Sequence, residues 1–77
     1  MEIKILGPGC PKCKTLEKLT REVVEENGIV ATVTKVEDIV AIMNYGVLTT
    51  PALVIDEKVV LKGRVPSPDE LKSILTR

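Results

Sequence analysis

The sequence contains no histidine, no phenylalanine and no tryptophan, and it contains one tyrosine. The absence of histidine excludes Ser-His and Cys-His catalytic pairs, zinc sites with imidazole ligands and histidine pH switches. The shortage of aromatic residues means that Val, Ile and Leu must build the core. Two cysteines are too few for the disulfide framework of small secreted domains, so we expect them to carry chemistry rather than to hold the fold.

An excess of charge and a long apolar run are also missing. Eleven Lys and Arg balance eleven Asp and Glu, for a formal net charge of zero, whereas nucleic-acid-binding domains usually carry a basic excess. No apolar stretch approaches the ~18 to 20 residues that cross a bilayer, and the N-terminal residues show no pattern typical of a secretion signal. We therefore expect a cytoplasmic protein that binds neither nucleic acid nor membrane.

What is present is typical of a small folded domain. Hydrophobic residues make up 44% of the 77 residues and charged residues 29%, a balance that disordered chains do not have. The length is about half of a typical ~150-residue domain, and the sequence shows no repeat or linker. We therefore expect residues 1–77 to form a single domain and to act as a monomer.

Short apolar segments separated by Gly and Pro predict seven secondary-structure elements. β-Branched and alternating residues predict strands over residues 1–6, 29–36, 52–55 and 58–61. Cap residues predict three helices, which begin at Pro11, after Asp38 and after Ser67. The apolar positions expected to face the core are Leu16, Leu19, Val23 and Val24 in the first helix, Ile39, Ile42 and Met43 in the second, and Leu71, Ile74 and Leu75 in the third.

The order of these elements predicts an α/β fold, βαβαββα. The first two strands should be parallel, because a helix crosses between them, and the last two should be antiparallel. A mixed four-stranded sheet with helices on both faces follows. Asp56 and Glu57 join the last two strands, and a type I′ turn favours Gly where Glu57 stands. We therefore expect a longer or different turn there.

The residues with the clearest chemistry are Cys10-Pro11-Lys12-Cys13, where a strand-ending loop enters the first helix. A helix N-terminus carries unpaired N–H groups and partial positive charge, which favour a thiolate over a thiol at the cap. Cys13 lies one turn further along the same face, within reach of a disulfide but more enclosed. We therefore predict Cys10 as the attacking thiolate and Cys13 as the resolving thiol.

Positive charge surrounds this pair in the sequence. Lys12, Lys14 and Lys18 lie in the first half of the helix, against the preference of the helix dipole. One interpretation is that they hold a positive potential around Cys10, and the other is that they form an ordinary solvated face. A CxxC pair by itself also occurs in metal sites or as two inert buried thiols.

A second feature is Thr50-Pro51, directly before a short apolar strand. Proline at that place indicates, on its own, a simple strand boundary. The CxxC motif and Thr50-Pro51 together are more specific for a protein family than either is alone. The first segment that carries the resemblance is Leu6-Gly7-Pro8-Gly9-Cys10-Pro11-Lys12-Cys13. Together with residues 45–47, 49–56 and 62–67, this segment resembles the thioredoxin superfamily, specifically its short thioredoxin-like or glutaredoxin-like redox-disulfide members. The resemblance covers essentially the whole chain.

The resemblance implies a cis peptide bond between Thr50 and Pro51 that faces the cysteines, with the Thr50 backbone available to pair with an extended substrate segment. It also implies that Pro51 shapes the site and that Gly63 lies in a loop beside the same groove. One position departs from the family pattern, because Lys4 stands where thioredoxins carry a buried acid. Proton transfer to and from Cys13 must therefore use water or another group.

The site predicted from the sequence consists of the redox pair Cys10 and Cys13, with Pro11, Lys12, Thr50, Pro51 and Gly63 shaping it. The leading hypothesis is a thiol–disulfide oxidoreductase that acts on protein disulfides and is regenerated by an external reductant or reductase. The sulfurs carry the electrons, so the reaction requires neither an organic cofactor nor a metal. Two alternatives remain open: a soft-metal-binding module that uses the two thiolates, and a non-catalytic domain that binds a partner.

Overall fold

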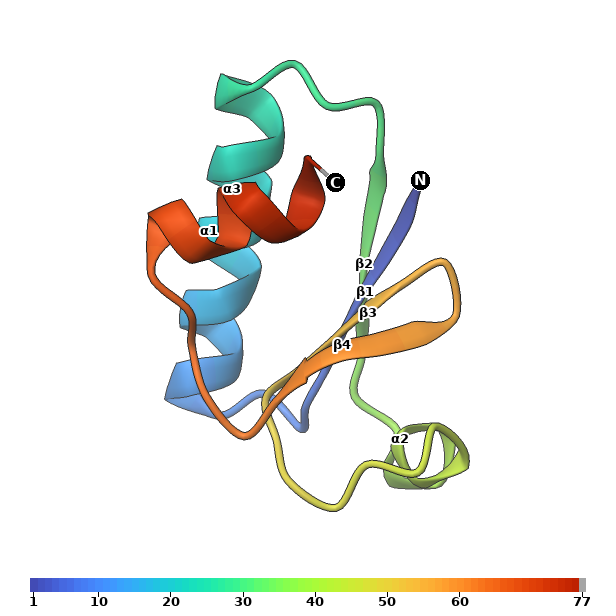
Figure 1. Ribbon diagram of the computed structural model, residues 1–77. Coiled ribbons are helices and arrows are strands. Elements are labelled where there is room, and N and C mark those ends of the chain that lie inside the picture. Colours follow the sequence, from blue (N-terminus) through green and yellow to red (C-terminus); the bar gives the residue numbers. More distant parts are fainter. Residues whose placement is uncertain (77) are drawn as a thin grey trace.

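The computed structural model describes residues 1–76 and contains the seven predicted elements in the predicted order (Figure 1). They are β1 (Glu2–Leu6), α1 (Pro11–Glu26), β2 (Thr32–Val36), α2 (Ile39–Asn44), β3 (Ala52–Ile55), β4 (Lys58–Lys62) and α3 (Pro68–Leu75). Arg77, the last residue of the predicted domain range, lies outside the described residues. The N-cap positions of the three helices are occupied by Cys10, Asp38 and Ser67.

The four strands form one mixed sheet in the order β2-β1-β3-β4. β1 is parallel to β2, with Ile3 opposite Val33, and antiparallel to β3, with Ile5 opposite Leu53. β3 and β4 are antiparallel neighbours, as predicted. These directions bring the C-terminal ends of β1, β2 and β4 and the N-terminal end of β3 to the same edge of the sheet. The loops that leave this edge build the site described below.

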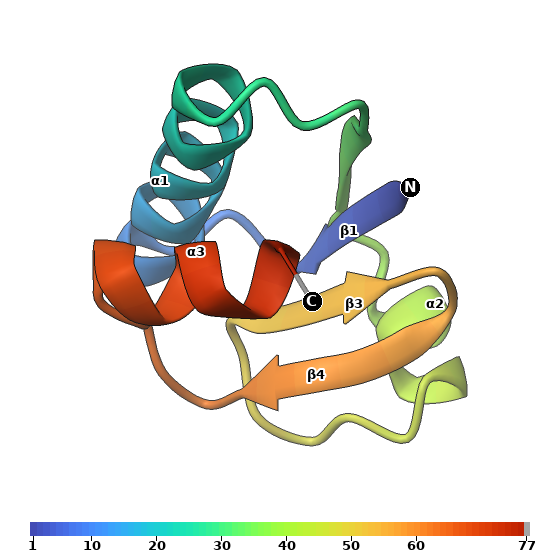
Figure 2. The same ribbon diagram turned by 45° about the horizontal axis from the view of Figure 1, so that its top comes forward.

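The helices cover both faces of the sheet, as predicted. α1 and α3 lie together on one face and α2 lies on the other, which Figure 1 shows with the sheet nearly edge-on. Figure 2 shows the same separation, with α2 partly hidden behind β3 and β4. Because successive side chains of a strand point to opposite faces, β1 directs Ile3 and Ile5 toward α1 and α3, and Leu6 toward α2.

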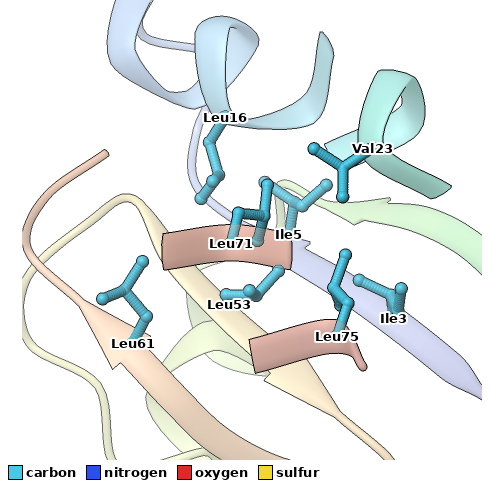
Figure 3. Packing of buried hydrophobic residues seen from close by; sticks show 8 residues of the cluster. All are labelled: Ile3, Ile5, Leu16, Val23, Leu53, Leu61, Leu71 and Leu75. Atoms are coloured by element: carbon cyan, nitrogen blue, oxygen red, sulfur yellow. The ribbon is translucent and has the colours of Figure 1, made fainter. Parts of the chain in front are cut away.

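The larger core lies between the sheet and the helices α1 and α3. Its buried side chains are Ile3, Ile5, Leu16, Val23, Leu53, Leu61, Leu71 and Leu75. Figure 3 shows these side chains pointing toward one another; they come from β1, β3, β4, α1 and α3. The predicted core residues Leu19, Val24 and Ile74 are partly buried and pack against this cluster. Branched aliphatic side chains therefore fill the space in which larger domains often place aromatic rings.

The smaller core lies on the α2 side of the sheet. Its buried side chains are Leu6, Ile42, Val47, Ala52 and Val54. The prediction that Ile39 and Met43 also face the core is wrong, because these side chains are 55% and 58% exposed. A helix of six residues makes less than two turns, so it presents few positions to the sheet. Ile39 and Met43 instead line a surface groove.

The second strand is shorter than predicted. It begins at Thr32 rather than at Ile29. β1 begins at Glu2, which pairs with Thr32, so residues 29–31 have no neighbouring strand to join. The N–H of Ile29 donates instead to the carbonyl of Val24 at 3.0 Å.

The prediction of a longer or different turn between β3 and β4 is wrong. Two residues, Asp56 and Glu57, connect the strands in a tight turn. Asp56 and Glu57 have φ values of 48° and 69°, and a type I′ turn requires positive φ at both positions. Asp56 forms two hydrogen bonds with the backbone of Glu2, each 2.8 Å long. The Glu57 carboxylate accepts hydrogen bonds from Lys4 Nζ at 2.6 Å and from the Tyr45 hydroxyl at 3.1 Å. These long-range contacts offset the unfavourable backbone preference of the two residues.

The contact with Lys4 makes the acid stability of the fold depend on Glu57. Hydrogen bonds from Lys4, and secondarily from Tyr45, lower the pKa of Glu57 below its ordinary value. Such a carboxylate stabilises the fold above its unfolded-state pKa, and this contribution is lost as pH falls through the lowered pKa of the folded state. We predict that Glu57→Gln loses less stability than the wild type between about pH 5 and pH 3.

Urea unfolding at a series of pH values measures this difference. Glu26→Gln, which removes an exposed carboxylate at the end of α1, is the matched control and should follow the wild-type acid profile. Parallel acid profiles for Glu57→Gln and the wild type would contradict the prediction.

Candidate active site

The site lies at the sheet edge where β1, β2 and β4 end and β3 begins. The loop after β1 leads to Cys10, the residues before β3 include Thr50 and Pro51, and the chain after β4 contains Gly63. The residues predicted from the sequence therefore come from three separate segments. The directions of the strands bring these segments to one edge.

Cys10 is the N-cap of α1, with extended backbone angles of φ −68° and ψ 163°. Pro11 is the first helical residue, where its missing N–H costs no hydrogen bond. The Sγ atom of Cys10 accepts a hydrogen bond from the N–H of Cys13 at 3.3 Å. A disulfide joins the two cysteines, whose Cα atoms lie 5.1 Å apart. The sulfur of Cys10 therefore lies at the positive end of a 16-residue helix.

The two sulfurs are not equally enclosed. Cys10 is half-buried, whereas Cys13 is 5% exposed. Gly7 packs directly on Cys13, because a Cβ atom added at Gly7 would overlap the Cys13 sulfur. Lys12 and Lys14 are exposed in the first turn of α1, and this turn contains no acidic residue. The site thus has one cysteine close to the surface and a second one enclosed behind it.

The peptide bond between Thr50 and Pro51 is cis, as the resemblance implied. The Cβ position at Gly7 that meets Cys13 also lies 3.9 Å from the Cβ atom of Thr50, so Thr50 and Cys13 are neighbours beside Gly7. Pro51 is buried, and its carbonyl accepts a hydrogen bond from the N–H of Gly63 at 2.9 Å. Gly63 has a φ of 79°, which glycine adopts without steric cost.

A shallow apolar groove of about 280 Å³ begins beside Thr50. Its lining residues are Pro8, Ile39, Ile42, Met43, Val47, Leu48 and Thr50. Leu48 is 91% exposed, and Ile39 and Met43 are more than half exposed. An exposed apolar surface of this kind is typical of a site that contacts other proteins.

A smaller cavity of about 50 Å³, called here the Cys13 cavity, reaches the enclosed side of Cys13. The charged residues that line it are Lys14, Glu17, Lys35 and Glu37. The sequence analysis assigned neither Gly7 nor this charged lining to the site. Glu17 could have been predicted from the sequence, because it follows Cys13 by four residues and therefore lies on the same helical face. The positions of Gly7 and Lys35 depend on how β1, β2 and α1 pack.

Lys4 does not face the cysteines. Its side chain leaves β1 on the α2 side of the sheet, where Nζ lies 2.9 Å from the Tyr45 hydroxyl and also contacts Glu57. Cys13 lies on the opposite side, in α1. The departure from the family pattern at Lys4 therefore places no positive charge beside Cys13.

Within residues 1–76, no three Cys, His, Asp or Glu side chains gather closely enough to hold a metal ion. Tetrahedral zinc coordination by the two thiolates would thus need ligands from another molecule. Across the same residues, none of the helices is long and apolar enough to span a membrane.

This arrangement is that of a thioredoxin-like redox protein. The Thioredoxin domain family model matches residues 1–76, and the chain belongs to this family. It is 41% identical over 76 residues to "Thioredoxin" of Methanothermobacter thermautotrophicus, with 99% of each chain covered. It is 40% identical over 73 residues to "Thioredoxin" of Methanocaldococcus jannaschii, with 95% of this chain and 84% of that protein covered. The family resemblance inferred from the sequence is confirmed.

Proposed function

We propose that this chain is a thiol–disulfide oxidoreductase in which Cys10 attacks substrate disulfides and Cys13 resolves the mixed disulfide. The observation that best supports these roles is the unequal pair. Cys10 is half-buried at the N-cap of α1, and Cys13 is buried one turn behind it and joined to it by a disulfide. Membership of the Thioredoxin domain family supports the same activity.

The first step is the attack of the Cys10 thiolate on a substrate disulfide. The helix dipole and the N–H of Cys13 stabilise negative charge on this sulfur. Lys12 and Lys14 add positive charge in the same turn. The Cys10 sulfur bonds to one substrate sulfur, the substrate disulfide breaks, and the second substrate sulfur leaves as a thiolate.

The second step takes place within the protein. Deprotonated Cys13 attacks the sulfur of Cys10, the Cys10–Cys13 disulfide forms, and the bond to the substrate breaks. The substrate leaves with both of its sulfurs reduced. Two electrons from an external dithiol or reductase must then reduce the Cys10–Cys13 disulfide before the next cycle.

The substrates that we propose are disulfides of other proteins. The apolar groove, which begins beside Thr50, offers a contact surface to apolar side chains of such a protein. We also propose, from the family resemblance, that the backbone of Thr50 pairs with an extended segment of the substrate. The proposal also includes a single monomeric domain in the cytoplasm, which size-exclusion chromatography and cell fractionation test.

Alkylation of the reduced, metal-free protein across pH tests the function. We expect iodoacetamide to modify Cys10 selectively, with a midpoint well below the free-thiol value of about 8.5. Mass spectrometry of the digested protein locates the modified cysteine. Lys12→Glu combined with Lys14→Glu should raise the midpoint, because it removes positive charge near Cys10. The same reversal on β4 and α3, Lys58→Glu with Lys72→Glu, is the matched control and should leave the midpoint unchanged.

Equal, slow labelling of both cysteines with an ordinary midpoint would contradict the proposal. It would favour one of the two alternatives, a metal-binding module or a non-catalytic partner-binding domain. Metal analysis of protein purified without reductant separates these alternatives, because only the first predicts a soft metal bound in stoichiometric amount.

A further inference from the structure

The enclosed position of Cys13 creates a chemical requirement that Cys10 does not share. A thiol must lose its proton before its sulfur can attack a disulfide. Cys13 is only 5% exposed, and burial disfavours the charged form of an ionisable group, here the thiolate. A proton acceptor close to Cys13 would therefore accelerate the resolving step, and the Cys13 cavity is where the structure offers one.

Two carboxylates line the Cys13 cavity, those of Glu17 and Glu37. Glu17 follows Cys13 by one helical turn on the same face of α1, and its side chain is 19% exposed. Glu37 stands just after β2 and its side chain is 54% exposed. Glu17 is therefore the carboxylate that shares the enclosed part of the cavity with the thiol.

Basic side chains hold the Glu17 carboxylate in place. Arg21, one turn further along α1, donates to Oε2 from Nε at 3.1 Å and from Nη2 at 3.0 Å. Lys35 Nζ lies 4.0 Å from Oε1 of Glu17 and 3.6 Å from the carboxylate of Glu37. Lys14 of α1 completes the charged lining of the cavity. Arg21 thus engages one oxygen of Glu17, and the second oxygen is left with the more distant Lys35.

The cavity also has the size and polarity that ordered water needs. A cavity of about 50 Å³ with several charged groups on its wall has room for a water molecule with hydrogen-bonding partners. A general base acts either by direct contact or through one such water. Both routes are compatible with the positions of Cys13 and Glu17 on successive turns of one helix.

We propose that Glu17 is the proton acceptor for Cys13 in the resolving step. The Glu17 carboxylate takes the Cys13 proton, directly or through a water in the cavity, and the resulting thiolate attacks the sulfur of Cys10. The Cys10–Cys13 bond forms and the bond between Cys10 and the substrate breaks. The leaving substrate sulfur keeps the electron pair of the broken bond, and Glu17 then releases its proton to solvent. This inference rests on the proposed function.

The reaction of the reduced protein with one equivalent of 5,5′-dithiobis(2-nitrobenzoate) separates the two steps. Attack by Cys10 releases a first coloured thiolate. Attack by Cys13 on the resulting mixed disulfide releases a second one. Stopped-flow absorbance gives the rate of each phase as a function of pH.

Glu17→Gln should slow the second phase by about ten-fold or more near neutral pH and leave the first phase unchanged. Its second phase should accelerate as pH rises toward the ordinary thiol range. Glutamine keeps the size of the side chain and an oxygen that accepts from Arg21, so the pH profile distinguishes a lost proton acceptor from lost packing. Glu22→Gln, an exposed change on the same helix, is the matched control and should leave both phases unchanged.

A wild-type rate and pH profile in the second phase of Glu17→Gln would overturn the proposal. So would a slow second phase in Glu37→Gln together with an unaffected one in Glu17→Gln. Failure of the proposed function looks different, because the wild type would then show no fast first phase at Cys10 or would release only one thiolate. The same absorbance traces therefore distinguish the two failures.

Discussion

Replacement of Cys13 by serine is expected to convert the protein into a covalent trap for its substrates. In Cys13→Ser, Cys10 still attacks a disulfide, but a hydroxyl cannot displace the bound substrate sulfur, so the mixed disulfide accumulates. The N-cap remains intact, because the Cys10 sulfur accepts from the backbone N–H of residue 13, which serine retains. We expect close to one adduct per protein molecule, and turnover that falls to the uncatalysed rate.

Incubation with insulin, followed by non-reducing electrophoresis and mass spectrometry, measures this adduct. Added dithiol should release it, which shows that the bond is a disulfide. Cys10→Ser is the matched control and should form no adduct, because the remaining cysteine is buried. Adduct formation by Cys10→Ser at the rate of Cys13→Ser would show that the two roles are assigned wrongly.

Gly7→Ala is expected to destabilise the fold through a single overlap. The added methyl group would occupy the position of the Cys13 sulfur and approach its Cβ atom to 3.0 Å. Gly7 is not among the glycines with positive φ, so alanine suits its backbone and the cost arises from overpacking. Overpacking of a buried site costs about 1 to 3 kcal/mol, a large share of the ~4 to 12 kcal/mol expected for a chain of this length. Urea unfolding of the reduced protein measures the loss.

A double-mutant cycle identifies the overlap as the cause. In a Cys13→Ala background the overlapping sulfur is absent, so the loss caused by Gly7→Ala should shrink by a coupling energy of about 0.5 to 3 kcal/mol. Gly28→Ala is the control, because Gly28 has a φ of 60° and nothing lies within 4 Å of its added Cβ. Its cost is backbone strain alone and should be equal in both backgrounds. An equal loss for Gly7→Ala in both backgrounds would exclude the overlap as the cause.

Local signals were sufficient for most of the fold. The last helix illustrates this, because Ser67 caps it, Pro68 begins it, and the N–H of Glu70 donates to the Ser67 hydroxyl at 3.2 Å. A Glu three residues after a Ser N-cap often accepts from the backbone N–H of the cap residue, but the carboxylate of Glu70 pairs with Arg64, whose Nη1 lies 2.7 Å from Oε1. The orientation of the Glu70 side chain is therefore set by Arg64, a residue outside the helix. The same limit explains the β3–β4 turn, where contacts from β1 outweigh the local preference.

The residues of the site also fall into two groups, those that the local sequence predicts and those that it does not. Cys10 and Cys13 could be located from their spacing and from the helix start at Pro11, which lies between them. Thr50, Pro51 and Gly63 came only from the family resemblance, because nothing local to those residues points toward the cysteines. Gly7 could not be recognised as a packing partner of Cys13, since their contact depends on how α1 lies against the end of β1.

Glu17 could be predicted only in part from the sequence. Its spacing from Cys13 places it on the same helical face, and this could be seen in the sequence. The charges around it could not be seen there, because they include Lys35, which β2 brings to the cavity by pairing it with Ile5 in β1. Strand register therefore decides which charges reach the enclosed cysteine.

The unequal faces of the sheet imply unequal resistance to local opening. α2 has six residues, of which Ile42 is buried, whereas the opposite face carries the larger core. Segments with few buried apolar contacts open at a lower free energy than the molecule as a whole. We therefore expect the groove wall that contains Ile39 and Met43 to open at a lower free energy than the sheet and α1. Such a groove would fit the proposed protein substrates even where their surfaces differ in shape, without displacing the redox pair.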